Sequence, residues 1–147
     1  MKNKYYTPDI EDLRVGYELE KVILRLKPKH TSDNETYIEG WEKFIVDEDQ
    51  MQYICLLIRG ASEDNNMLRV PYLTEEQIEN EGWAVEEIDP LNPFIKGKKD
   101  SKEFLFNRDN YELHLTNQIS LNAIKLLYNG ECKSINDFRY ICKLLKI

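Results

Sequence analysis

The sequence predicts an α+β fold: a mainly antiparallel sheet of about six strands, a short helix over 75–81 and a C-terminal helix over 135–146. Two observations support this prediction. Several short segments alternate apolar and polar residues, as half-buried strands do, and two segments follow the spacing of helices. The chain has 147 residues, of which 41% are hydrophobic and 32% charged. This is the size and composition of one globular domain, so we expect a single domain over residues 1–147.

The first half of the chain is expected to form four strands, over 15–26, 37–46, 51–59 and 67–72. The acidic turn at 47–50 separates two of these segments, so 51–59 is predicted to be the antiparallel neighbour of 37–46. Polar loops are expected at 28–34 and 60–66. Because Pro71 has no N–H to donate, the fourth strand is predicted to end there or to lie at a sheet edge.

The short helix has clear start and stop signals. Thr74 can cap it and Gln77 stands at the third helical position, which is the arrangement of a capping box. Leu73 and Ile78 occupy the two positions of a hydrophobic staple. Gly82 can close the helix in the left-handed conformation that a side chain resists. The acidic residues of this segment are therefore expected to define a helix.

The second half is predicted to contain strands, a hairpin and the last helix. The expected strands are 83–88, 103–106 and 111–115, and two prolines predict an irregular connection over 89–100. Residues 120–128 fit either a helix or a strand; a strand is favoured in their second half because Asn129-Gly130 is typical of a hairpin turn. Ser134 is expected to cap the C-terminal helix, whose apolar residues recur at helical spacing.

The charge and the cysteines exclude several classes of function. The net charge is −7, which argues against general nucleic-acid binding, although Lys96–Lys99 could form a local basic site. No apolar run reaches the roughly 18 residues of a membrane span, and no leader segment is expected, so we expect a cytoplasmic protein. Disulfides are not expected among three cysteines, and Cys55 and Cys142 are interpreted as buried hydrophobic residues.

No catalytic motif is present in the sequence. The glycines are isolated, which excludes a phosphate-binding loop, and no serine stands in a nucleophile-elbow context. Neither His30 nor His114 has a cysteine or carboxylate at ligand spacing. We therefore expect no cofactor, and we assign no catalytic residue and no metal ligand on the basis of a motif.

The candidate binding residues are Arg14, Glu18, Glu20, Arg69 and Tyr72. Strand alternation puts Glu18 and Glu20 on one face, about 7 Å apart from the strand rise alone, where they could hold a metal ion or divide acid and base work. A solvated strand face shows the same pattern. Arg14 and Arg69 could bind an acidic or phosphate group, or they could be exposed arginines at a sheet rim.

Three phrases of the chain, in order, resemble a group of small uncharacterised bacteriophage and prophage proteins. They are 6–20, 68–83 and 134–147, and the group's pattern is TPxIxxFxVGFEYE, then RVxYLxxEDIExxGW, then KSELKxLLKxLxI; together they cover about a third of the chain. Leu13 and Leu19 stand where the group has aromatic residues, and Pro71 replaces a basic or polar residue. The resemblance implies a phage or mobile element expressed in a bacterial cytoplasm, and it implies no mechanism.

The leading hypothesis from the sequence is a small non-enzymatic accessory protein that binds a host or phage macromolecule and could interfere with a host system. An alternative is a binder of small, nucleotide-like ligands or a metal-dependent hydrolase. In that alternative, Glu18 and Glu20 would hold the metal, or Arg14 and Arg69 would bind phosphate. A further alternative is a minor virion component.

Overall fold

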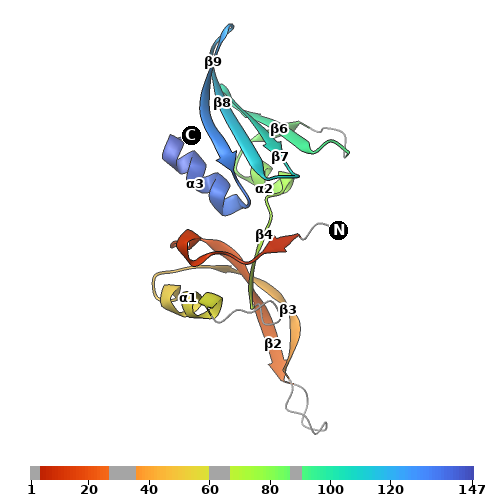
Figure 1. Cartoon of the computed structure of the whole chain (residues 1–147), viewed down its shortest axis with the longest axis vertical. Helices are drawn as coiled ribbons and strands as arrows, with labels where there is room; N and C mark the ends of the chain where they lie inside the picture. Colours follow the sequence, from red (N-terminus) through yellow and green to blue (C-terminus); the bar gives the residue numbers. More distant parts are fainter. Residues whose placement is uncertain (1–3, 27–35, 60–66, 87–90) are drawn as a thin grey trace. The chain divides into compact units, whose positions relative to one another are not determined.

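The computed structural model describes residues 4–26, 36–59, 67–86 and 91–147. The chain forms two compact units, unit 1 (Met1–Pro71) and unit 2 (Tyr72–Ile147), and each contains a hydrophobic core of its own (Figure 1). The fold class is α+β, as predicted, but the described residues form two antiparallel sheets instead of one. The single domain stays a prediction, since two cores can still unfold together.

Unit 1 is built on a four-stranded sheet in the order β1-β4-β2-β3. The strands are β1 (Tyr5–Tyr6), β2 (Glu18–Leu26), β3 (Thr36–Ile45) and β4 (Leu68–Pro71), and a short 3-10 helix, η1 (Ile10–Asp12), precedes β2. The strands predicted within 15–26, 37–46 and 67–72 are confirmed. Pro71 is the last residue of β4, one of the two positions expected for it. The loops predicted at 28–34 and 60–66 lie outside the described residues.

The strand predicted over 51–59 is wrong, because these residues form a helix, α1 (Met51–Arg59). A continuous apolar run fits a buried strand and a helix equally, so the pattern could not decide. In the structure Ile54 is buried, and Met51 and Ile58 pack against the same core at helical spacing. The Asp47 carboxylate accepts a hydrogen bond from the Gln50 N–H at 2.8 Å, so the predicted acidic hairpin turn is a helix start.

The core of unit 1 lies between α1 and one face of the sheet. Alternate residues of the strands point into it, as the two-residue period of a strand requires. The fully buried members are Tyr17, Leu19, Val46, Ile54, Leu68 and Val70. Glu18 and Glu20, which alternate with Leu19, therefore lie on the opposite face of the sheet.

Unit 2 is built on a five-stranded antiparallel sheet in the order β5-β6-β7-β8-β9. The strands are β5 (Ala84–Glu86), β6 (Phe94–Lys99), β7 (Lys102–Asn107), β8 (Glu112–Ser120) and β9 (Ala123–Glu131). The irregular connection predicted over 89–100 is wrong for 94–99, which is β6. Pro93 stands just before the strand, so it limits where β6 begins without interrupting it.

The turn of the β8–β9 hairpin is not at Asn129-Gly130, where it was predicted. Asn129 and Gly130 lie inside β9, where they pair with His114 and Leu113. The turn is at residues 121–122, and the segment whose pattern fits both a helix and a strand is a strand. Pairing with β8 on both sides of two register shifts overrides the local turn preference of Asn-Gly.

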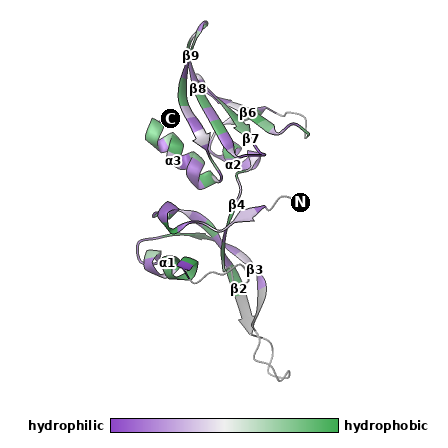
Figure 2. Cartoon of the chain, in the orientation of Figure 1, coloured by the Kyte–Doolittle hydropathy of each residue, from purple (hydrophilic) through white to green (hydrophobic). Residues whose placement is uncertain are grey.

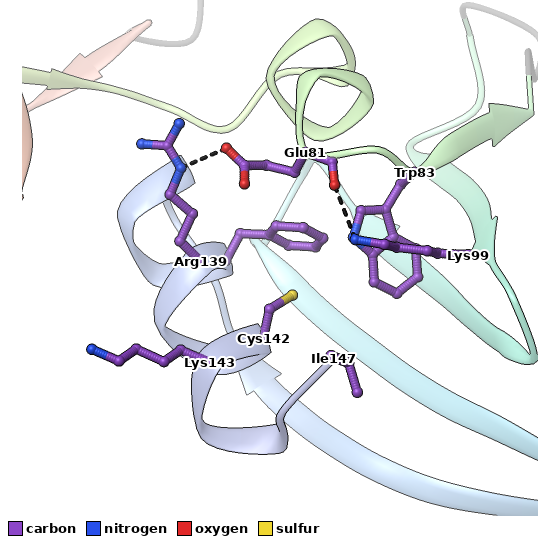
Figure 3. Close-up of a pocket in the computed structure, with 8 residues that line it drawn as sticks. Glu81, Trp83, Lys99, Arg139, Cys142, Lys143 and Ile147 are labelled. Atoms are coloured by element: carbon purple, nitrogen blue, oxygen red, sulfur yellow. Dashed lines mark hydrogen bonds and ion pairs between the residues drawn. The ribbon is translucent and has the colours of Figure 1, made fainter.

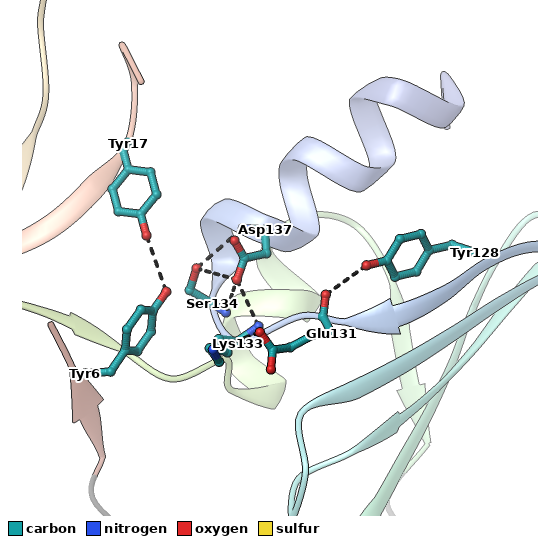
Figure 4. A network of polar contacts seen from close by, with 7 residues as sticks. All are labelled: Tyr6, Tyr17, Tyr128, Glu131, Lys133, Ser134 and Asp137. Carbon is teal, nitrogen blue, oxygen red and sulfur yellow. Dashed lines mark hydrogen bonds and ion pairs between the residues drawn. The ribbon is translucent and has the colours of Figure 1, made fainter. Parts of the chain in front are cut away.

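Two capped helices cover one face of this sheet, and both were predicted. In α2 (Glu75–Asn80), Thr74 and Gln77 form the capping box, and Gly82 follows with φ +83°. In α3 (Ile135–Leu145), Ser134 and Asp137 form a second box (Figure 4). The core beneath them contains Leu73, Ile78, Trp83, Ile95, Phe104, Phe106, Leu113, Leu115, Cys132, Ile135, Phe138 and Ile141.

Candidate functional site

Two of the predicted binding residues, Glu20 and Arg69, meet in unit 1. The Arg69 Nε donates to a Glu20 carboxylate oxygen at 2.6 Å. The guanidinium carbon lies 3.6 Å from the ring centroid of Tyr5 and 4.0 Å from that of Trp41. A planar guanidinium stacks well on aromatic rings, so Arg69 is held by two rings and one carboxylate.

The four members of this cluster come from four different strands: Tyr5 from β1, Arg69 from β4, Glu20 from β2 and Trp41 from β3. Cross-strand contacts of this kind stabilise a sheet. The cluster therefore acts as a clamp across the face of the sheet opposite the core. The Arg69 side chain is only 23% exposed, and its charge is already matched by Glu20.

Glu18 forms an ion pair with a different residue. The Lys43 ammonium of β3 lies 2.7 Å from its carboxylate. The two glutamates share a face of β2, as predicted, and each is paired with a cation on a neighbouring strand. Within the described ranges, no three His, Cys, Asp or Glu side chains gather where they could hold a metal ion. Metal binding by Glu18 and Glu20 stays a prediction.

Arg14 and Tyr72 each contact an aromatic ring. The Arg14 guanidinium carbon is 5.8 Å from the ring centroid of Tyr17, in unit 1. Tyr72 belongs to unit 2, where its ring stacks on that of Tyr111, with centroids 4.3 Å apart and planes 6° apart. Of the five candidate residues, Glu20 and Arg69 are the two that contact each other directly.

The lysines of Lys96–Lys99 do not form one basic patch. Lys96 and Lys98 lie on one face of β6 and approach the carboxylate of Glu86, and Lys98 also pairs with Glu103. Lys99 lies on the other face, where its ammonium donates to the backbone carbonyl of Glu81. The three lysines are thus divided between the two faces of the strand, and the absence of general nucleic-acid binding stays a prediction.

The surface with the most exposed apolar side chains is the β8–β9 arm, which we define as residues 116–126. Ile119 is 64% exposed, Leu121 95%, Ile124 73% and Leu126 56%. The arm extends beyond β7, because β7 pairs with β8 only as far as Asn117 (Figure 1). Figure 2 shows apolar and polar residues alternating along both strands. Large apolar groups concentrated on one projecting segment mark an interaction surface.

The arm is also nearly uncharged. Between Leu113 and Gly130 the only Lys, Arg, Asp or Glu is Lys125, in a chain where charged residues make up 32%. The sequence analysis missed this surface. Alternation of apolar and polar residues predicts a strand, but it does not show whether the apolar face is buried or exposed. The low charge of this stretch was the signal that could have found it.

The open edge of β9 is protected at its end by Tyr128. Cys132 N–H donates to the Tyr111 carbonyl, so Glu131 and Glu112 are a non-hydrogen-bonded pair and the Glu131 backbone points away from β8. The Tyr128 hydroxyl donates to that outward carbonyl at 2.8 Å (Figure 4). This occupied carbonyl opposes the addition of another strand at that end of β9.

Comparison with known proteins gives no relative. No protein family, no curated protein and no solved structure matches this chain. Among the described residues, no helix is long and apolar enough to cross a membrane. The resemblance to a phage protein group therefore stays a prediction.

Proposed function

We propose that this chain is a non-enzymatic binding protein, encoded by a phage or mobile element, that docks on a host or phage protein through the β8–β9 arm. The observation that supports the proposal is the exposure of Ile119, Leu121, Ile124 and Leu126 on one projecting hairpin. Burying a side chain of this size contributes about 1.5–3 kcal/mol. Four such side chains can form the apolar centre of a binding surface.

The chemistry of the arm favours a protein with an apolar groove as its partner. Ile124 and Leu126 alternate with Lys125, so they lie on one face of β9, and Leu121 stands at the turn. A nucleic acid would need several cations to neutralise its phosphates, and the arm has one. An apolar groove matches both the uncharged surface and its narrow, projecting shape.

The test is the double variant Leu121→Ser, Ile124→Ser. Both side chains are exposed, so the fold and its melting temperature should be preserved. Proteins captured from a bacterial lysate by the tagged chain are identified and purified, and binding is then measured by calorimetry. We expect one protein to bind the unmodified chain at a fixed stoichiometry and to bind the double variant about 100-fold more weakly.

The matched control is the double variant Tyr53→Ser, Leu56→Ser on α1, where two apolar side chains are 61% and 60% exposed. Binding to this variant should equal that of the unmodified chain. Equal binding by the arm variant would contradict the proposal. So would dimerisation of the chain through the arm, or its adsorption to lipid vesicles through the arm.

A further inference from the structure

A cavity of about 210 Å³ lies in unit 2, where α3 faces the ends of α2 and β6. Arg139, Cys142 and Lys143 reach it from α3, Glu81 from the end of α2, and Lys99 from the end of β6. Trp83, Phe138 and Ile147 supply apolar surface. The cavity is separate from the β8–β9 arm, so a ligand bound in it would be independent of the proposed function.

The charge of the lining differs from that of its surroundings. Unit 2 has 10 basic and 13 acidic residues, a net charge of −3. The lining contains three cations and one carboxylate, a net charge of +2. A local positive excess on an acidic unit attracts small anions.

Two of the cations are held in place by Glu81. Its carboxylate accepts a hydrogen bond from the Arg139 Nε at 2.6 Å, and its backbone carbonyl accepts one from the Lys99 ammonium at 3.1 Å (Figure 3). The Lys99 ammonium also lies 5.9 Å from the ring centroid of Trp83. Cations that are already ordered lose less entropy when a ligand binds.

Lys143 is the third cation. Its stem lines the rim and its ammonium extends outward in Figure 3. No hydrogen bond or ion pair joins this ammonium to another residue in the described part of the chain. A change of rotamer would bring it onto a ligand, as the flexible stem of lysine permits.

The remaining lining is neutral and apolar. Trp83 and Phe138 pack edge to face, with ring centroids 5.8 Å apart. The Cys142 thiol points from α3 into the cavity (Figure 3). Burial raises the pKa of this thiol to about 11. The positive charge of Lys99 lowers the pKa, and the negative charge of Glu81 raises it to a smaller extent. The thiol is therefore uncharged at neutral pH and does not repel an anion.

Size and charge limit the ligand. Sites for drug-sized molecules measure about 300–1,000 Å³, so this cavity suits a smaller molecule than a nucleotide. The lining combines its three cations with the apolar surface of Trp83, Phe138 and Ile147, so a ligand with one charged group and one apolar part fits it. We propose that the cavity binds a small organic monocarboxylate, whose charge is attracted by Lys99, Arg139 and Lys143 and whose apolar part contacts the apolar side chains of the lining.

Benzoate is a suitable probe, and benzamide is its neutral equivalent. The measurement is a titration of the ¹⁵N-labelled full chain, followed at the Trp83 indole and the amides of residues 138–143. We expect saturable shifts with benzoate, and binding of benzamide at least about tenfold weaker, because a charged hydrogen bond is lost.

Adjacent lysines of β6 provide the matched variants. Lys99→Met should weaken benzoate binding about tenfold, whereas Lys98→Met, on the opposite face of the strand, should leave it within twofold. Lys143→Met, at an exposed position that cannot disturb the fold, should weaken it about threefold. Equal affinity for benzamide, equal effects of Lys98→Met and Lys99→Met, or no saturable shift at the Trp83 indole would overturn the proposal.

Discussion

The two units use the open faces of their sheets differently. In unit 1 the face opposite the core is closed by the Arg69 clamp and by the ion pair of Glu18 with Lys43. In unit 2 the sheet continues into an arm whose apolar side chains are exposed. Charged partners that satisfy each other contribute to stability, whereas apolar groups without a cover are available for binding. The face of unit 1 therefore stabilises the fold, whereas the β8–β9 arm of unit 2 is available to bind a partner.

The largest effect is expected in the core of unit 2. Phe138 is fully buried and meets Trp83 and Phe104 edge to face. Phe138→Ala should lower the free energy of unfolding by about 3–5 kcal/mol, because it removes these contacts and leaves a cavity. Urea unfolding followed by circular dichroism measures it. Leu144→Ala, at an exposed position of the same helix, is the control and should change stability by less than about 0.5 kcal/mol.

A smaller loss is expected from the clamp of unit 1. Arg69→Lys keeps the charge but removes the planar group that stacks on Tyr5 and Trp41. The expected loss is about 2 kcal/mol, measured by the same unfolding experiment. Lys43→Met, which removes the exposed partner of Glu18, should cost less than about 1 kcal/mol. If Arg69→Lys were neutral, the face of unit 1 would not be a stabilising surface.

The smallest effect concerns the start of α1. Asp47→Ala removes the carboxylate that accepts the Gln50 N–H, and it should cost about 1 kcal/mol. Glu48→Ala, in the same turn, is the matched control and should be close to neutral. Stability that responds equally to both changes would mean that the charge of the turn matters and that the hydrogen bond between Asp47 and Gln50 does not.

The sequence predicted the parts of the fold that depend on local rules. Thr74 with Gln77 marked α2, and the helical spacing after Ser134 marked α3, because a capping box and an apolar stripe involve neighbouring residues. The helix α1 was missed, although Asp47 and Gln50 have the same spacing before an apolar run as a capping box has. The continuous apolar run at 53–58 fits a buried strand as well, and the prediction followed that pattern.

The sites could not be predicted, because they depend on strand register and on packing between distant segments. The clamp joins residues 5, 20, 41 and 69, and a shift of one residue in any strand would turn its side chain to the other face. The cavity likewise depends on Glu81, Lys99 and α3 meeting in space. Glu20 and Arg69 were identified as candidates, but their pairing with each other was not foreseen.

The separation into two units can be tested with the two tryptophans, since Trp41 belongs to unit 1 and Trp83 to unit 2. Incorporation of 5-fluorotryptophan gives one ¹⁹F resonance for each unit during urea unfolding. With separate cores, Phe138→Ala should lower the unfolding midpoint at Trp83 and leave the midpoint at Trp41 unchanged. Equal shifts of both midpoints would show that the two cores unfold together as one domain and would contradict independent unfolding of the two units.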